Sequence, residues 1–241
     1  MTNSVKSQRE RLLEAAGEIF AERGFHEATV RDICRRARAN LAAIKYHFGG
    51  KTQLYREALV VAQGCSIEEQ MPSRAAPEQR LRQLIGARLL RVFDGRRPAW
   101  HGRLLSREMI DPTPALDAIV GERIRPRFEQ LQAVVRELLG PLASQEQARL
   151  CALSIIGQCL FYYHARTVLE RLFPRRRYSG RDIDRLADHI AQFSLAAMRA
   201  MRRRLEMPRP ADPRRVAALS PALLRGRATA AWTRRESGDD A

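Results

Sequence analysis

Apolar residues recur every three or four positions along most of this chain, which is the spacing of one face of an α-helix. The first such face runs through Leu12, Ala16, Ile19 and Phe20. Ser7 and Glu10 precede it in the S-x-x-E order of a capping box, which opens a helix. Gly24 stands just past the pattern, where a residue with positive φ commonly ends a helix. The pattern predicts an all-α chain whose first element is amphipathic.

Residues 29–48 divide into two short helices joined by a polar turn. Thr29 can cap the first helix, with Asp32 in the acidic position of a capping box. Asn40 can cap the second, which covers residues 41–47 and is too short to be stable alone. Neighbouring elements must hold its apolar side, so its other side is left free. A helix-turn-helix presents a short helix to the major groove of DNA in this way.

A further helix begins at Lys51, after Gly49 and Gly50. A basic residue is unfavourable at a helix N-terminus, which prefers anions. Its presence is explained if Lys51 and the helix N-terminus together receive a DNA phosphate. Residues 1–65 are therefore predicted to form a three-helix DNA-binding domain of the helix-turn-helix type.

Proline and glycine divide the rest of the chain into longer elements. Helices are expected over residues 78–93, 102–110, 114–139 with a kink or boundary at Pro126, 144–172 and 183–205. Residues 66–205 would then form a larger helical domain for effector binding and dimerisation. Residues 206–241 begin with a proline-rich stretch and are predicted to be a disordered basic tail.

The last two predicted helices are apolar over most of their surface, so they must be buried on more than one side. One of those sides is expected to meet a second copy of the chain in a four-helix interface. The candidate residues are Ile156, Leu160, Leu186, Ile190, Phe193 and Ala197. The alternative is burial within one chain. A homodimer is favoured because a single helix-turn-helix reads too few bases for useful specificity.

The charge balance agrees with a nucleic-acid partner. Lys and Arg number 43 against 27 Asp and Glu, a formal net charge of +16 that favours polyanions. The charge is spread along the chain, however, and an arginine-rich proteome would give the same excess. No window of 18 apolar residues predicts a membrane span, and no apolar N-terminal segment predicts a signal peptide. These two observations favour a cytoplasmic protein.

Cysteine, histidine and glycine patterns give no sign of catalysis. Cys34, Cys65, Cys151 and Cys159 have no CxxC spacing, and Cys151 and Cys159 would lie about 12 Å apart along one helix, too far for a disulfide. Buried thiols are favoured over a redox sensor. The five histidines form no ligand cluster, and there is no Gly-rich phosphate loop or G-x-S-x-G motif. We therefore expect no catalytic residues, no metal, no cofactor and no enzyme activity.

Five runs carry a family resemblance: LLEAAGEIFAERGF, TVRDICRRA and IKYHFGGKTQLY in the first third, then SREMIDPTPALDAIVGERIRPRFEQLQAVVRELLG and LSIIGQCLFYYHARTVLERLFP. Through the first three, residues 7–62 resemble the DNA-binding domain of TetR/AcrR-type transcriptional regulators. The last two resemble the ligand domain of the CecR (YbiH-like, CerR-type) branch. The resemblance implies an all-α fold, a homodimer, double-stranded operator DNA as a partner and a small-molecule effector.

Two positions depart from the family pattern. Arg38 stands in the turn where Gly is usual, so it must adopt a positive φ or relax the turn, at a cost of order 1 kcal/mol. Lys45 stands where Tyr is common and can still reach a phosphate, as a flexible point charge.

The candidate DNA contacts combine the motif with this resemblance. They are Thr29, Arg31, Asn40, Leu41, Ala42, Ala43, Lys45, Tyr46, His47 and Lys51. If the second short helix docks as in the family, Leu41, Ala42 and Ala43 face the bases and offer only apolar contacts of the kind that read a thymine methyl. The alternative for Tyr46 and His47 is packing against the first helix.

The effector pocket is expected within residues 78–172. Candidates are polar groups in apolar runs: Trp100, Arg107, Glu108, Gln158, Cys159, Tyr162, Tyr163 and His164. Arg107 and Glu108 could instead form an ion pair, and the two tyrosines could belong to the core or to an interface.

These expectations describe a ligand-responsive transcriptional repressor that binds a palindromic operator as a homodimer and is released by an effector. One alternative is a nonspecific basic DNA-binding protein, against which the large apolar second domain argues. The other is a small-molecule-binding helical protein whose DNA motif is vestigial.

Overall fold

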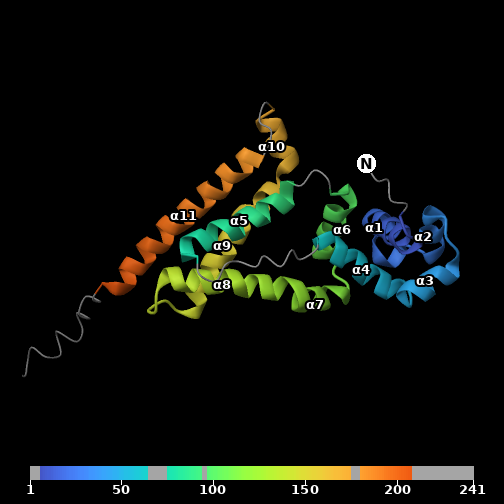
Figure 1. Cartoon of the computed structure of the whole chain (residues 1–241), viewed down its shortest axis with the longest axis horizontal. Helices are drawn as coiled ribbons and strands as arrows, with labels where there is room; N and C mark the ends of the chain where they lie inside the picture. The colour runs from blue at the N-terminus through green and yellow to red at the C-terminus, as the bar shows by residue number, and fades with distance from the viewer. Residues whose placement is uncertain (1–5, 65–74, 94–96, 175–179, 208–241) are drawn as a thin grey trace, which may run out of the picture. The chain divides into compact units, whose positions relative to one another are not determined.

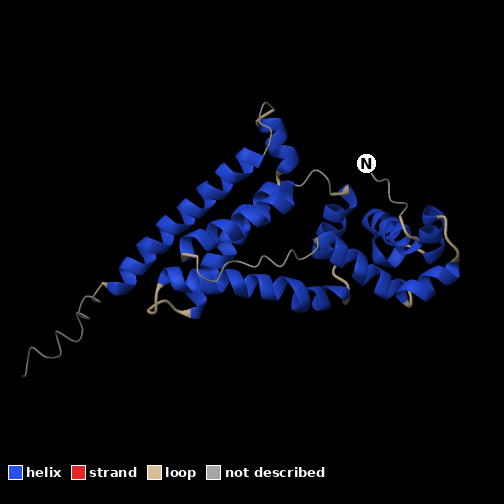
Figure 2. Ribbon diagram, in the orientation of Figure 1, coloured by secondary structure: helices blue, strands red, loops and turns tan. Residues whose placement is uncertain are grey.

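A computed structural model describes residues 6–64, 75–93, 97–174 and 180–207. Every regular element in these ranges is helical (Figure 2). The first four are α1 (Gln8–Glu27), α2 (Val30–Ala37), α3 (Leu41–Phe48) and α4 (Lys51–Gln63) (Figure 1). The others are α5 (Pro77–Phe93), α6 (Ala99–Ile110), α7 (Ala115–Ile119), a π-helical turn (Val120–Ile124), α8 (Arg125–Leu139), α9 (Gln145–His164), α10 (Arg166–Leu172) and α11 (Gly180–Glu206).

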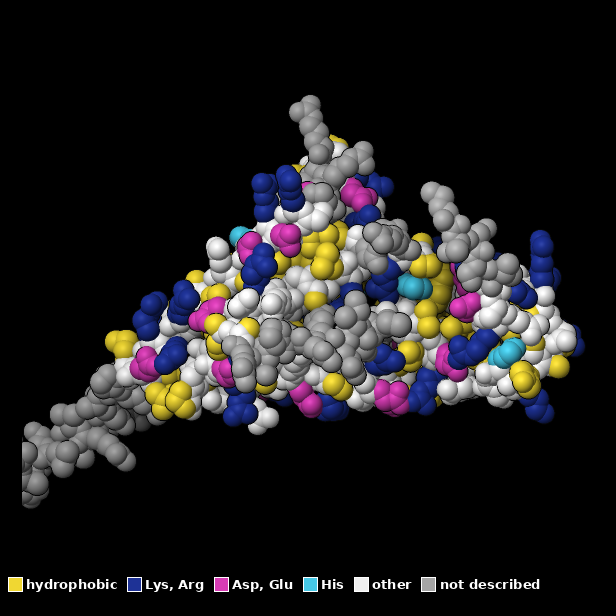
Figure 3. Space-filling model, in the orientation of Figure 1, with side chains coloured by type: hydrophobic (Ala, Val, Ile, Leu, Met, Phe, Trp, Pro, Cys, Tyr) yellow, Lys and Arg dark blue, Asp and Glu magenta, His cyan; other side chains and the backbone are white. Residues whose placement is uncertain are grey.

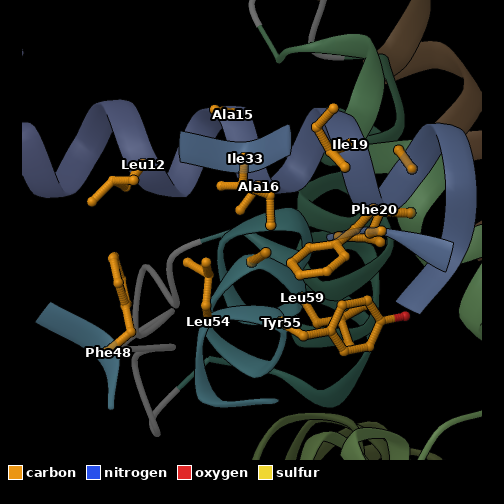
Figure 4. Packing of buried hydrophobic residues seen from close by; sticks show 14 of the residues in the cluster. Leu12, Ala15, Ala16, Ile19, Phe20, Ile33, Phe48, Leu54, Tyr55 and Leu59 are labelled. Carbon is orange, nitrogen blue, oxygen red and sulfur yellow. The ribbon is translucent and has the colours of Figure 1, made fainter. Parts of the chain in front are cut away.

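Helices α1 to α4 pack around one apolar core (Figure 4). Its largest fully buried members include Leu12, Phe20, Ile33, Ile44, Leu54, Tyr55 and Leu59. The predicted capping box of α1 is present, with the Ser7 side chain and the Glu10 carboxylate each accepting the other residue's backbone N–H. Gly24 has the predicted positive φ, at 80°, and ends the regular part of α1 although helical turns continue to Glu27.

Helix α6 joins this same core. Trp100 and Leu104 of α6 are buried in it, as are Ala115 and Ile119 of α7. Gly17 lets α6 approach α1, because a Cβ atom at that position would overlap the Trp100 ring. The helix-turn-helix is thus packed directly on a helix of the predicted effector domain, residues 66–205.

A second core lies between α5, α8, α9 and α11. Its buried side chains include Leu81, Ile85, Leu131, Val135, Ile155, Cys159, Leu186 and Ile190. Arg82 of α5 pairs with Asp188 of α11 at its edge. None of the helices in the described ranges combines the length and apolar content that a bilayer crossing requires.

One predicted element differs in the structure, and one predicted boundary is confirmed. The single helix expected over residues 144–172 is broken at Ala165, whose φ of −88° and ψ of 5° are not helical. The boundary predicted at Pro126 is present between residues 114 and 139. Pro126 lies at the start of α8, and the π turn before it accommodates a residue that cannot donate to the carbonyl four positions back.

The predicted boundary between the first two domains, residue Cys65 and nearly all of the predicted tail lie outside the described residues. Helix α11 ends at Glu206, close to the predicted start of that tail.

Candidate nucleic-acid interface and cavity

The turn between α2 and α3 is held by side-chain caps. Thr29 Oγ1 accepts the Asp32 backbone N–H at 3.1 Å, and Asn40 Oδ1 accepts the Ala43 N–H at 2.9 Å. Asp32 occupies the acidic position predicted for a capping box. Its carboxylate accepts the Thr29 hydroxyl and pairs with Arg23, and these contacts hold the pKa of Asp32 below its usual value.

Arg38 stands where glycine is usual in the family, and it takes the left-handed conformation predicted for that position, with φ 51° and ψ 50°. The Cys34 thiol lies beneath this turn and donates to the Asn40 carbonyl at 3.4 Å. Burial raises the pKa of Cys34, so the thiol stays protonated and serves the turn as a structural donor.

The outer face of α3 presents large side chains to solvent. Tyr46 is 85% exposed and Leu41 is 51% exposed, and Ala42 and Lys45 are exposed beside them. Ile44 and Phe48 anchor the opposite face in the core. Ala43, expected to face the bases, is 4% exposed and belongs to that anchored face. The expectation for Ala43 was wrong because three consecutive helical residues cannot share one face.

Basic residues around α3 fall into paired and unpaired groups. Arg35 pairs with Asp32, and Arg36 pairs with Glu22 and Glu18. Arg31 and Lys45 are exposed and form no ion pair with any residue that the structure describes. On the face drawn in Figure 3, Lys and Arg are spread over many elements with Asp and Glu among them, so position matters more than total charge.

His47 and Lys51 contact the protein's own scaffold. His47 Nε2 lies 3.2 Å from Gln8 Oε1 of α1, which matches the alternative of packing against the first helix. Lys51 donates to the His26 carbonyl at 3.3 Å and lies over the Phe25 ring, and burial lowers its pKa. A phosphate could engage Lys51 only in competition with these contacts.

A buried hydrogen-bond group connects α4 to α6 and α7. The Tyr55 hydroxyl donates to Glu108 Oε2, while Glu108 Oε1 accepts the Thr113 N–H at 2.9 Å and the Thr113 hydroxyl at 2.8 Å. Burial, then the Glu108 contact, raise the pKa of Tyr55, so its hydroxyl remains a donor. Glu108 is 2% exposed and therefore connects the DNA-binding helices to α6 from inside the protein.

A cavity of about 860 Å³ lies between α1 and α4 on one side and α5, α6, α9 and α10 on the other. Its walls come from single residues of α1 and α4, the end of α5, the segment before α6, one side of α6 along its length, and the turn from α9 into α10. The residues that matter to its chemistry are Arg91, Arg97, Arg103, Arg107 and Arg166, His101 and His164, Tyr163 and Asp111. The Tyr163 side chain reaches the backbone of Gly102, where a Cβ atom would collide with its hydroxyl.

Three predicted pocket residues, Arg107, Tyr163 and His164, line this cavity. The other five do not. Trp100 and Glu108 are buried in the first core and at the junction, and Cys159 is fully buried in the second core. Gln158 bonds to Ser194 of α11 at 3.5 Å, and Tyr162 packs against the second core.

Sequence reasoning did not find four of the five cavity arginines. They come from α5, the segment before α6, α6 itself and α10, so no local pattern joins them. Arg103 with Arg107, four apart on one face of α6, was the only available signal.

The predicted dimer residues also separate. Leu186 and Ile190 are buried within this chain, so the expectation that they meet a second copy was wrong, and Ile156 and Leu160 are half-buried. Phe193 is 62% exposed, with Ala197 exposed one turn on. Leu153, Gly157 and Phe161 expose a matching stripe on α9. We call this surface the α9–α11 apolar face; it consists of Leu153, Gly157, Phe161, Phe193 and Ala197.

Comparison with known families decides the identity. The model for bacterial regulatory proteins of the tetR family matches residues 12–58. The model for the C-terminal domain of the HTH-type transcriptional dual regulator CecR matches residues 77–198, half of the chain. The chain belongs to the TetR family. As a TetR-family member with a CecR-type C-terminal domain, it is a ligand-responsive transcriptional regulator that binds operator DNA as a homodimer.

Relatives agree with this assignment. The HTH-type transcriptional dual regulator CecR of Shigella flexneri is 29% identical over 178 residues, covering 67% of this chain and 78% of that protein. The HTH-type transcriptional repressor Rv3405c of Mycobacterium tuberculosis is 28% identical over 134 residues, 49% of this chain and 59% of that protein. The crystal structure of AibR in complex with isovaleryl coenzyme A and operator DNA shares the fold, with a TM-score of 0.54, 21% identity, and coverage of 78% and 97%.

Among the described residues of this TetR-family chain, no three His, Cys, Asp or Glu side chains are grouped closely enough to hold a metal ion.

Proposed function

We propose that this TetR-family regulator acts as a repressor and reads its operator with the outer face of α3. The proposal rests on Tyr46 and Leu41. Both are large and exposed, whereas Ile44 and Phe48 hold the opposite face of α3 in the core, so Tyr46 and Leu41 are not needed for packing. Tyr46, Leu41 and Ala42 would contact base edges and thymine methyl groups in the major groove. Lys45 and Arg31 would contact phosphates, with Thr29 and Asn40 holding the helices in place.

The α9–α11 apolar face supports the dimer geometry of the proposal. Phe161 and Phe193 are both more than half exposed, on helices otherwise anchored in the second core. A second copy packed on this face would form a four-helix interface and bury these rings. Two recognition helices related by a two-fold axis would then read a palindromic operator.

The cavity is the proposed effector site. Most of its lining residues belong to the effector domain of residues 66–205, and a few belong to the DNA-binding domain of residues 1–65. Its walls include residues of α1 and α4 as well as α6, so a bound molecule contacts both halves. An effector that binds one arrangement of these helices better than the other shifts the spacing of the recognition helices. The AibR structure, with a small-molecule ligand and operator DNA, is a precedent at the level of fold.

The cavity binds the effector and catalyses no reaction. The protein acts in the cytoplasm, because its operator lies on the chromosome. The relatives are described as regulators, which supports a protein that is not an enzyme.

The experiment is binding of the purified full-length protein to its own upstream intergenic DNA and to a scrambled duplex across a salt series. We expect the native duplex to bind roughly a thousandfold more tightly at physiological salt. Equal binding that weakens in parallel with salt would instead support a nonspecific basic DNA-binding protein.

A further inference from the structure

The cavity walls carry a strong excess of positive charge. Five arginines line it, and Asp111 is the single carboxylate among the lining residues that the structure describes. Arg166 pairs with Glu170 at 3.0 Å, outside the lining set. Guanidinium groups do not lose their proton in proteins, so this charge persists at every physiological pH.

Two of these arginines donate hydrogen bonds to backbone carbonyls of the DNA-binding helices. Arg107 Nη1 donates to the Glu22 carbonyl of α1 at 3.2 Å. Arg97 donates to the Ala62 carbonyl of α4, and its Nε lies 3.4 Å from His101 Nδ1. Burial, then the nearby Arg97 charge, lower the pKa of His101 to about 4, so the imidazole is neutral at pH 7.

The approach of Arg107 to α1 is unusually close. Gly24 sits where a Cβ atom would lie 2.7 Å from Arg107 Nε, and its positive φ of 80° also favours glycine. The end of α1 is therefore shaped to receive this guanidinium. Arg97 and Arg107 together are called the arginine brace, because they tie α6 and the segment before it to α1 and α4.

We propose that the effector of this cavity is an organic anion, and that it acts by drawing the arginine brace away from α1 and α4. The inference rests on the proposed effector role of the cavity. Hydrogen bonds to an ionised acceptor are about twice as strong as those to a neutral one, so a carboxylate or phosphate oxygen outcompetes a backbone carbonyl. Both chemistries fit a guanidinium fork, and Val92, Leu105 and Tyr163 supply a wall for the apolar part of the molecule.

Release of the brace gives the effector a route to the recognition helix. Helix α1 packs on α2 and α4, and α3 packs between α2 and α4. Loss of the bonds to Glu22 and Ala62 releases the C-terminal ends of α1 and α4, and α3 follows through its contacts with α2 and α4. The anion binds the shifted arrangement better because only there are both guanidinium groups available to it.

The test compares four probes with the same alkyl chain: octanoate, octyl phosphate, octanol and octylammonium. Binding to the full-length protein is measured by calorimetry at physiological salt. We expect octanoate or octyl phosphate to bind at least tenfold more tightly than octanol, with octylammonium weakest. The stronger of the two anions identifies the head group. Equal binding of all four probes, or no anion binding at millimolar concentration, overturns the inference.

Variants separate the brace from general charge. Arg107→Gln and Arg97→Gln should weaken anion binding at least tenfold, and in the absence of any anion should already weaken operator binding. Arg181→Gln, an exposed arginine at the start of α11, is the matched control and should change neither. Anion affinity that is unchanged in both brace variants overturns the inference.

Failure of this inference is distinguishable from failure of the proposed function. Anion binding is measured without DNA, and operator preference is measured without anion. A protein that prefers its operator but does not discriminate among the four probes keeps its function and loses the anion assignment. A protein without operator preference loses the proposed function whichever probe binds.

Discussion

At the scale of single residues, Arg38 shows how far local chemistry can be predicted. The turn between α2 and α3 requires a residue with positive φ. Because Arg38 occupies that position, its backbone strain is predicted from the sequence, and the structure contains it. Arg38 is the one described residue other than glycine with a positive φ.

Replacing Arg38 by glycine should therefore stabilise the protein by about 0.5–1 kcal/mol, since glycine adopts this conformation without a Cβ penalty. Arg35→Gly, three residues earlier in regular helix, is the matched control and should destabilise by about 1 kcal/mol. Denaturant unfolding of both variants measures the two changes. A loss of stability in Arg38→Gly would contradict the strain argument.

His101 gives a prediction about pH. Its pKa is lowered to about 4 in the folded protein, so the unfolded chain binds a proton first as pH falls. The unfolded state is thereby favoured, and His101 costs stability progressively from about pH 6.5 down to about pH 4. The free energy of unfolding measured over this range should fall less steeply in His101→Gln than in the wild type. Identical slopes would show that His101 is not buried as a neutral base.

Ala43 marks where residue-scale prediction failed. The resemblance predicts that Leu41, Ala42 and Ala43 all face the bases, but successive residues are rotated by about 100° around a helix. Ile44 and Phe48 fix which side is anchored, and Ala43 lies on that side. The outer face could have been derived from these two anchors alone.

At the scale of elements, most helices lie where the apolar spacing predicts them, because capping and helix-breaking residues act within a few positions along the chain. The start of α1 and both ends of α3 were predicted from Ser7, Asn40 and Gly49, whereas α1 continues three residues past Gly24. The packing of α6 on α1 was not predictable, because Gly17 and Trp100 are 83 positions apart and neither signals the other. The cavity arginines other than Arg107 were not predicted, for the same reason.

Gly17→Ala tests the packing of α6 on α1. The added methyl would overlap the Trp100 ring, and overpacking of this kind costs about 1–3 kcal/mol. Gly86→Ala on α5 is the matched control, because its Cβ would meet only Ala187 at an ordinary 3.8 Å. Helix propensity should make the control neutral or stabilising by up to about 1 kcal/mol. Equal thermal stability of the two variants would mean that Trp100 does not pack on Gly17.

At the scale of the whole molecule, the dimer follows from surfaces that one chain leaves uncovered. The sequence predicted that α9 and α11 are apolar on more than one side, yet could not divide those sides between core and interface. The structure makes the division: Leu186 and Ile190 are buried within the chain, whereas Phe161 and Phe193 face outward.

A charge placed on the α9–α11 apolar face should separate the subunits. Phe193→Glu would bring a carboxylate into the proposed interface, which disfavours association strongly unless the charge is paired. We expect a monomer by sedimentation velocity and a loss of operator affinity. Leu142→Glu, at a position that is 61% exposed in the loop before α9, is the control and should remain dimeric. A dimeric Phe193→Glu protein would place the interface elsewhere.

The central claim is that the outer face of α3 reads the operator, and Tyr46 tests it most directly. Fluorescence anisotropy at physiological salt should give the ratio of affinities for the upstream duplex and a scrambled duplex, in the wild type and in Tyr46→Ala. Loss of a base contact is expected to cost about 1–3 kcal/mol, so that ratio should fall by about fivefold to a hundredfold while binding to the scrambled duplex is nearly unchanged. An unaltered ratio in Tyr46→Ala, with specific binding intact, would contradict the account.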